Sequence, residues 1–428
     1  MKRIGITLVS SFLCVCLCGF FAGCKAVVDE ESASSMLSVP SEMTVVTLCV
    51  DHRAVRSELG PVLQAIPGYG KEFLVDTTMI PPSGGERDAV VTRVRTEMMA
   101  GKGPDLFFCE CPLLGQWNLE QKDETALFPF PGQMLENRAF LPLDSYIAHA
   151  EFMEWDKLFP AVMEAGKGSE GQMLLPLTYS LWNVVLCPKD ESSPSFERPM
   201  TWREMAASED PVLRFTAAIG WMNDIAGDFA DYSKDELRLT EEELLEYVRD
   251  YSRLRGEVQE NYGEQGGEII DFSAETLQAV GSGLGDNDKR YCMIPCYNIS
   301  GGVTVNITNF VAINRNTEHP DEAFRVLDYL LSKDVQRTSD LYQNGLLGMP
   351  VHLELGQADT PLWGSWYMSE ENFREFQALR QEVNTAKFPG PLDAALLKIK
   401  EASSSSEEAL KAAVHKQYME MRMMLGES

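Results

Sequence analysis

The sequence has few of the residues from which metal and nucleotide sites are usually built. It has only 5 histidines among 428 residues, and its ten cysteines include no pair of CxxC motifs with zinc-ligand spacing. No HExxH, no GxSxG and no complete P-loop motif occurs. We therefore expect no bound metal, no nucleotide and no other cofactor.

Positive charge is also scarce. The chain has 37 Lys and Arg against 65 Asp and Glu, which gives a formal net charge of -28 and a pI of about 4.6. This balance argues against nucleic acid or an anionic membrane surface as the partner, and it favours a neutral or cationic small ligand. Because 44% of the residues are hydrophobic, the chain can bury a large core, and its length favours two domains over one.

The segment Gly101-Lys102-Gly103 resembles part of a phosphate-binding loop. A P-loop follows a strand and precedes a helix, but here the order is reversed. Apolar residues at steps of three and four predict a helix over 88–100, and the run 106–108 predicts a buried strand. No Ser or Thr follows Lys102 to hold a metal ion. The glycines therefore predict a helix-to-strand turn.

The N-terminus has the pattern of an export signal. Lys2 and Arg3 precede an apolar stretch from Ile4 to Phe21, which predicts a signal peptide over residues 1–23. The ending Ala22-Gly23-Cys24 resembles a lipobox, in which Cys24 is acylated and becomes the first mature residue. An ordinary secretory signal with an incidental cysteine is the alternative. Residues 24–43 are acidic, serine-rich and aperiodic, which predicts a flexible tether after the lipid anchor.

Six further cysteines follow Cys24. Several lie in strand-like apolar runs, so we expect them to be free buried thiols, with disulfides as one alternative and zinc as another. They are Cys49, Cys109, Cys111, Cys187, Cys292 and Cys296.

The beginning of the body alternates between strand and helix patterns. Strands are expected at 44–50, 72–76 and 106–108, with helices between them, and this alternation builds a parallel sheet covered by helices. Ligands gather at the carboxyl ends of such strands. Asp51 directly follows the first of them, and Glu110 comes just after the third, beyond Cys109.

Four passages carry a resemblance to a known family. They are AGKGPDLFF, FLPLDSYI, RPMTWREM, and NFVAINRNTEHPDEAFRVLDYLLSKDVQ leading to GLLGMPVH. With their order and spacing, over about 44–352, the body resembles the carbohydrate-type extracellular solute-binding proteins (family 1), which are the receptors of ABC importers. The tail EEALKAAVHKQYMEMRMML resembles the closing helix of these proteins. The chain departs from the pattern at Val185–Asp190 and lacks a Trp between Gly281 and Ile294.

The resemblance implies a periplasmic-binding-protein-like α/β fold, with two lobes joined by hinge crossings and a ligand cleft between them. Lobe 1 is expected at 44–178 and 297–345, and lobe 2 at 179–296 and 346–428. Proline and glycine between apolar strands place the crossings at Pro176–Ser180 and Pro295–Gly301. The resemblance also implies a monomeric receptor outside the cell, anchored at Cys24 to the outer face of the cytoplasmic membrane, which delivers its ligand to the transmembrane subunits of a permease.

A neutral sugar or short oligosaccharide is the ligand that the resemblance implies. Sugar recognition needs aromatic faces and planar polar groups, and we expect Trp182 and Trp221 to be the stacking platforms. Trp182 is equally compatible with a core position, and Trp221 is expected where an apolar strand at 217–220 enters a polar loop. The expected ligand-binding residues are Asp51, Glu110, Tyr179, Trp182, Asn183, Trp221, Tyr297 and Trp363.

Other functions remain open at this point. Asp51, Glu110 and Asp224 offer a carboxylate pair for glycoside cleavage, although acids are so abundant that such a pair has little weight. We therefore expect no catalytic residue and no enzyme. A ligand sensor accessory, or a peptide or polyamine receptor, would share the same fold.

Overall fold

The computed structural model describes residues 43–51, 55, 57–111, 126–190, 193–259, 268–272, 284–346, 348–361, 367–402 and 406–427. The expected signal peptide, Cys24 and Trp363 lie outside these residues, as does nearly all of the tether. Residues Glu42–Ser428 form one compact unit. Within the described part of the chain, no helix is both long and apolar enough to cross a membrane.

The first elements alternate as the sequence predicts. They are β1 (Thr44–Asp51), α1 (Leu59–Gln64), β2 (Phe73–Met79), α2 (Gly84–Met99) and β3 (Leu106–Glu110). Strand β1 pairs in parallel with β2 on one side and with β3 on the other. The alternation of apolar runs with a helix of period 3.6 therefore predicted this end of the sheet correctly.

The middle of the chain supplies short helices and the longest strand. In order, the elements are α3 (Pro131–Glu136), α4 (Asp144–Ile147), a 3₁₀ turn (Trp155–Lys157), α5 (Pro160–Glu164), β4 (Lys167–Gly168), β5 (Gly171–Gln172), β6 (Leu174–Pro188), α6 (Trp202–Ala206), α7 (Pro211–Ile219), α8 (Met222–Ala226), β7 (Ala230–Asp231), β8 (Glu236–Leu237), α9 (Glu241–Gln259) and β9 (Glu268–Phe272).

The last third adds the second long strand and the closing helices. These elements are β10 (Tyr291–Ile294), β11 (Val303–Ile313), α11 (Pro320–Leu330), α12 (Lys333–Thr338), a π-helical turn (Leu341–Gly345), β12 (Met349–Pro350), α13 (Glu370–Gln381), β13 (Val383–Lys387), α14 (Pro391–Ala402) and α15 (Glu407–Glu427).

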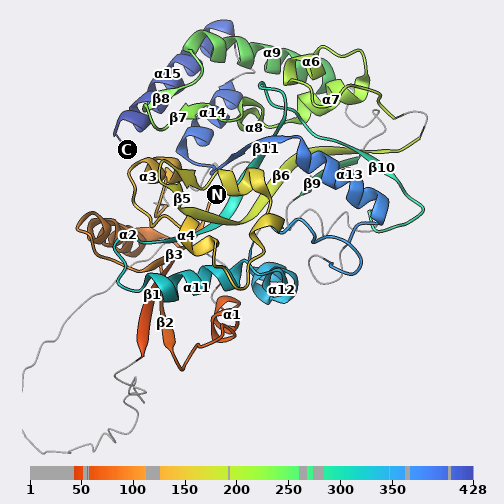
Figure 1. Ribbon diagram of the computed structural model, residues 1–428. Helices are drawn as coiled ribbons and strands as arrows, with labels where there is room; N and C mark the ends of the chain where they lie inside the picture. The colour runs from red at the N-terminus through yellow and green to blue at the C-terminus, as the bar shows by residue number, and fades with distance from the viewer. Residues whose placement is uncertain are drawn as a thin grey trace, which may run out of the picture. The chain divides into compact units, whose positions relative to one another are not determined.

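Two long strands run through the centre of the main sheet, whose main path follows the order β10-β6-β11-β3-β1-β2. Strands β9 and β12 also pair with β6, and β13 pairs with β11. Strand β6 pairs with β11 over residues 174–179 and then with β9 and β10 over 181–188. Strand β11 pairs with β13 at its start and with β3 at its end. Figure 1 shows both strands between the end of the body that carries β1 and β2 and the end that carries α9 and α15.

One expected crossing lies within a long strand, and the other directly precedes one. Pro176–Ser180 is in the middle of β6, where the pairing partner changes, and Pro295–Gly301 is the segment that connects β10 to β11. The division into two lobes, together with its boundaries, stays a prediction.

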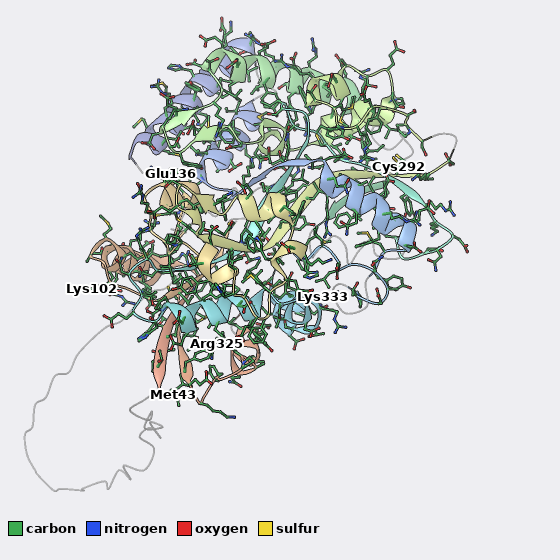
Figure 2. The ribbon with its side chains drawn as sticks, viewed as in Figure 1. Met43, Lys102, Glu136, Cys292, Arg325 and Lys333 are labelled. Carbon is green, nitrogen blue, oxygen red and sulfur yellow. The ribbon has the colours of Figure 1, made fainter. Side chains whose placement is uncertain are left out.

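The Gly101–Gly103 segment forms the predicted turn between α2 and β3. Gly101 and Gly103 have φ values of 72° and 98°, a region that glycine adopts without steric cost. The Asn314 side chain donates to the backbone carbonyls of Lys102 and Pro104 at 2.9 Å, which fixes the turn to the end of β11. The Lys102 side chain is exposed at the periphery (Figure 2). This segment is structural.

One element differs from its prediction, because the apolar run at 217–220 is not a strand. Residues Pro211–Ile219 form α7, whose first turn is capped by Asp210, which accepts from the N–H groups of Val212 and Leu213. Pro211 at the first helical position adds a fixed φ that suits a helix start. A short apolar run reads alike in a buried strand and a buried helix, and here the cap decides.

Candidate ligand-binding site

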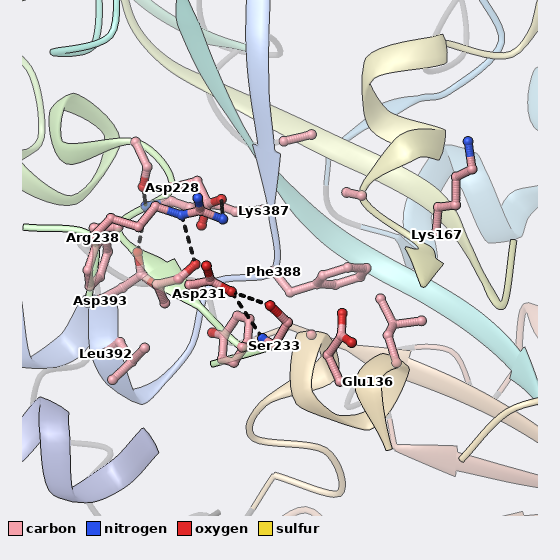
Figure 3. Close-up of a pocket in the computed structure, with 18 residues that line it drawn as sticks. Glu136, Lys167, Asp228, Asp231, Ser233, Arg238, Lys387, Phe388, Leu392 and Asp393 are labelled. Atoms are coloured by element: carbon pink, nitrogen blue, oxygen red, sulfur yellow. Dashed lines mark hydrogen bonds and ion pairs between the residues drawn. The ribbon is translucent and has the colours of Figure 1, made fainter. Parts of the chain in front are cut away.

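A cavity of about 340 Å³ lies among four segments that are far apart in the sequence (Figure 3). One wall comes from α3 and from the region of β4. The opposite wall comes from the β7–β8 hairpin and from the junction of β13 with α14. Its lining includes Gly132, Leu135, Glu136, Ala165 and Lys167 on the first wall, and Gly227–Ser233, Arg238, Ala386–Phe388, Leu392 and Asp393 on the second.

The two walls belong to different predicted lobes, and they touch at one edge of the cavity. The ring of Tyr232 lies directly on Gly132, since a Cβ at that glycine would be only 2.5 Å from the ring atom Cδ2. Beside this contact, Gln133 Nε2 donates to Asp235 Oδ1 at 3.5 Å, a long hydrogen bond. The hairpin therefore closes one edge of the cavity against α3.

Lys387 anchors the second wall. Its ammonium group donates to Asp393 Oδ1 at 2.7 Å and to the backbone carbonyls of Asn223 at 2.6 Å and Gly227 at 3.3 Å. It also lies 5.4 Å from the centre of the Phe229 ring. Both Lys387 and Asp393 are nearly buried. Because all these contacts are made within the protein, Lys387 holds α8 against β13 and its charge is already balanced.

The hairpin carries a second set of internally paired charges. Arg238 pairs with Asp228 at 3.2 Å, and Asp231 accepts from Ser233 Oγ at 2.6 Å and from Lys234 Nζ at 2.9 Å. The hydrogen bonds from Ser233 and Lys234 lower the pKa of Asp231 to about 2. Asp231 is therefore a carboxylate at any physiological pH, and its role is to shape the hairpin.

Two polar groups of the cavity remain available to a ligand. The Glu136 carboxylate and the Tyr232 hydroxyl make no hydrogen bond or ion pair with any residue that the structure describes. Burial raises the pKa of Tyr232, so its hydroxyl stays protonated and can donate. The ring of Phe388 lines the same space. An acceptor, a donor and aromatic surface are the groups that a neutral polyol needs.

Three of the expected ligand contacts are occupied by partners inside the protein. Asp51 forms a bidentate ion pair with Arg87, with N···O distances of 2.8 and 3.1 Å. It also accepts a hydrogen bond from the Leu127 N–H at 2.9 Å. It is 8% exposed. These contacts make Asp51 a buried support of the β1 end.

Tyr179 and Tyr297 are buried in a similar way. The Tyr179 hydroxyl accepts from Arg380 Nε at 2.9 Å, and its ring packs against Phe159. The Tyr297 hydroxyl donates to Glu382. Burial is the main cause that raises the pKa of both tyrosines. Both hydroxyls connect crossing segments to the region around α13.

The structure brings together three of the other predicted residues. Trp182 and Trp221 stack with ring centres 4.9 Å apart and planes 16° apart, and both are partly exposed. Asn183 lies beside them with a left-handed φ of 56°, at a register irregularity of β6. With its amide oriented to donate to the Ile219 carbonyl, it accepts from Trp221 Nε1 at 3.3 Å. A stacked, half-exposed tryptophan pair therefore exists, although neither ring lines the cavity.

Glu110 is half-buried at the carboxyl end of β3, opposite Asn309 in the β11 ladder. Trp363 lies outside the described residues. Of the seven predicted ligand residues that the structure describes, none is among those that line the cavity. Their assignment as ligand contacts stays a prediction.

Sequence reasoning missed the cavity residues altogether. Lys387 is far in the sequence from the hairpin residues Tyr232 and Arg238, and only the fold brings the two segments together. The Asp-Tyr-Ser-Lys-Asp run at 231–235 is a recognisable turn signal, but a turn by itself does not indicate a ligand.

Among the described residues, no group of three or more His, Cys, Asp or Glu side chains is arranged to hold a metal ion. The six cysteines beyond Cys24 are free: Cys49, Cys109, Cys111 and Cys187 are buried, and Cys292 and Cys296 are half-buried.

Comparison with known proteins identifies the fold. No family model matches the sequence, and no curated protein matches it. Among solved structures, the chain is similar to an extracellular solute-binding protein family 1 from Alicyclobacillus acidocaldarius, with 14% identity, a TM-score of 0.55, and coverage of 90% of this chain and 98% of the other. It is also similar to the sugar-binding protein MalE from Xanthomonas citri, with 13% identity, a TM-score of 0.56, and coverage of 90% and 98%.

The chain is also similar to a de novo designed cysteine esterase, with 12% identity, a TM-score of 0.57, and coverage of 90% of this chain and 99% of the other. At such identities the likeness concerns the fold alone. The chain therefore has the predicted α/β fold of the periplasmic-binding-protein-like solute-binding proteins.

Proposed function

We propose that this protein is a solute receptor that binds a neutral sugar or short oligosaccharide between its two predicted lobes. The observation that carries the proposal is the cavity whose walls come from both lobes and touch through Tyr232 and Gly132. A receptor of this kind closes over its ligand by a hinge motion, and such motion brings together walls from different lobes. The solute-binding proteins of similar fold support this role.

The charge of the cavity favours a neutral ligand. Its cationic groups are engaged by neighbours, since Lys387 pairs with Asp393, Arg238 with Asp228, and Lys167 with Glu164. Glu136 is a carboxylate without such a partner among the described residues. An anionic ligand would be repelled by Glu136 and by the net negative charge of the protein. The hydroxyl groups of a neutral sugar can instead donate to the Glu136 carboxylate.

The tryptophan pair fits into the same site. Trp221 immediately precedes α8, and the residues that follow α8, Gly227 and Asp228, line the cavity. We infer that the ligand site extends along α8 from the cavity to the exposed edges of Trp182 and Trp221. Glu110 and Trp363 stay in the proposal as further contacts of the same cleft. Asp51, Tyr179 and Tyr297 stay in it as predicted contacts whose polar atoms also have partners inside the protein.

The cellular role follows the same proposal. The protein is exported, is anchored to the outer face of the membrane through a lipid on Cys24, and delivers its sugar as a monomer to the transmembrane subunits of an ABC permease. Cys24→Ala tests the anchor. We expect the variant to appear in the medium or to keep its signal peptide, whereas unchanged processing and membrane retention would contradict the lipoprotein assignment.

A thermal-shift screen tests the ligand class. The panel contains maltose, maltotriose, mannotriose and xylotriose, together with amino acids, peptides and polyamines. A ligand that binds only the folded state raises the melting temperature by mass action. We expect at least one neutral sugar to do so, and Phe388→Ala to reduce the shift. Phe152→Ala is the matched control, because this half-buried ring packs on Tyr329 and does not line the cavity.

A carbohydrate hydrolase is the alternative that the fold leaves open, since a designed esterase shares it. Incubation of the purified protein with the same oligosaccharides separates the two. We expect binding without cleavage, and the appearance of shorter sugars would replace the receptor with an enzyme.

A further inference from the structure

Asn223 and Asp224 of α8 and Asn306 of β11 form a buried polar cluster in which some hydrogen-bond acceptors have no donor. Asn223 Nδ2 and Asn306 Nδ2 both donate to Asp224 Oδ1, at 3.2 and 2.8 Å. The exposed fractions are 1% for Asn223, 3% for Asn306 and 8% for Asp224. Because the carboxylate needs donors, it fixes which way both amides point.

The two amide oxygens consequently face away from that carboxylate. Asn223 Oδ1 and Asn306 Oδ1 are fully buried and accept no hydrogen bond from any residue that the structure describes. A buried acceptor without a donor is costly, and native proteins seldom keep one without a reason. Here two of them occur on residues that share a single carboxylate.

The cluster lies directly behind the second wall of the cavity. The Asn223 carbonyl accepts from Lys387, and Asn306 is the residue opposite Lys387 in the parallel β11–β13 ladder. On its other side, the Asp224 N–H donates to the Trp221 carbonyl at 3.0 Å. The cluster therefore occupies the short stretch between the cavity and the tryptophan pair.

Hydrogen bonds beside the cluster connect the backbone of α8 to β11. Thr304 Oγ1 donates to the Asp224 carbonyl at 2.7 Å, and Asn298 Nδ2 donates to Thr304 Oγ1 at 3.0 Å. Both amide oxygens are buried in this conformation, so a ligand reaches them when neighbouring side chains move while the α8 backbone stays in place.

We propose that Asn223, Asp224 and Asn306 form a subsite for paired hydrogen-bond donors, and that two neighbouring hydroxyl groups of a neutral sugar donate to Asn223 Oδ1 and Asn306 Oδ1. This inference rests on the proposed function and adds which ligands the receptor selects. Both atoms are acceptors beside a carboxylate, so the subsite rejects carboxylate and phosphate groups and selects a diol.

Affinity measurements on the full-length protein test this subsite, with maltotriose, mannotriose, xylotriose and trigalacturonate as probes. For the neutral sugar that binds best, Asn223→Ala is expected to weaken binding at least about tenfold, since one hydrogen bond to a buried polar group is lost. The ligand-free variant should melt close to the wild type, because the substitution removes an unsatisfied oxygen together with a long hydrogen bond. Asn344→Ala, at an exposed asparagine outside the cavity, is the matched control and should bind normally.

A deoxy analogue of the bound sugar provides the second measurement. If a hydroxyl meets Asn223, its removal weakens binding to the wild type but adds little further loss in Asn223→Ala, as a double-mutant cycle requires. If Asn223→Ala binds the sugar as tightly as the wild type, the subsite proposal is wrong and the receptor proposal stands. The same holds if the wild type binds trigalacturonate as tightly as the neutral sugar or more tightly. If no probe sugar binds the wild type, the proposed function fails and the subsite with it. If calcium or sodium chloride stabilises the wild type but not Asn223→Ala, the cluster is a cation site and the diol proposal is wrong.

Discussion

The ring of Tyr232 lies against Gly132 so closely that no side chain fits at this glycine. The contact joins the β7–β8 hairpin to α3 and closes one edge of the cavity. Gly132→Ala is expected to cost about 1–3 kcal/mol of unfolding free energy, because the ring must move to admit a methyl group. Denaturant unfolding measures this. Gly85→Ala is the control, since nothing lies within 4 Å of its added methyl and it is in the helix α2; equal stability of both variants would show that the contact is loose.

The buried ion pair between Asp51 and Arg87 leads to a second prediction. The two side chains are 10% and 8% exposed, so Arg87→Ala leaves an uncompensated carboxylate and should cost about 3–5 kcal/mol of unfolding free energy. Arg93→Ala on the same helix removes an exposed pair with Glu97, and it should cost less than about 1 kcal/mol. Similar losses in the two variants would contradict a structural role for Asp51.

How much of this could be predicted from the sequence depends on how local each feature is. The β1–β3 end of the sheet was predictable because local patterns encode it: short apolar runs in the strands, and apolar residues spaced by about 3.6 positions in the helix α2. The start of α6 is encoded locally too, since Thr201 followed three residues later by Glu204 is the pattern of a capping box, which the structure contains. The position of Trp221 was not, because the run before it is a helix capped by Asp210.

The candidate site was hidden for a physical reason. Tyr179 has the composition of a ligand contact, but it bonds to Arg380, which is 201 residues later in the chain. Conversely, Lys387 and Asn223 meet across 164 residues. No local pattern records such partners, so the sequence indicated which types of residue to expect and not which of them face the ligand.

His352 predicts a dependence of stability on pH. It is fully buried, and burial lowers its pKa below the ordinary value of 6.5. The folded state therefore favours the neutral ring, so this stabilisation is complete above 6.5 and is lost as the pH falls through the folded pKa. Unfolding free energies measured from roughly pH 7.5 to pH 5 should fall in the wild type and fall less steeply in His352→Gln. An unchanged slope in His352→Gln, equal to that of the exposed-residue control His149→Gln, would contradict this role.

The cysteines predict selective chemical reactivity. Burial raises the pKa of Cys49 to about 12 and that of Cys187 to about 11, so few thiolates exist at neutral pH. Iodoacetamide should leave both unmodified in the native protein and modify both after denaturation without a reductant, as peptide mass spectrometry can show. Modification that requires a reductant would mean that they form disulfides.

Isothermal titration calorimetry of the full-length protein with neutral oligosaccharides is the decisive test of the sugar-receptor proposal. We expect one binding site per chain for at least one neutral sugar, with a dissociation constant of about 1 μM or below, roughly 8 kcal/mol of binding free energy. We also expect much weaker binding of that sugar to Phe388→Ala, and much weaker binding of its uronate counterpart to the wild type. Heat of binding from a peptide or polyamine, with none from any sugar, would contradict the proposed sugar receptor.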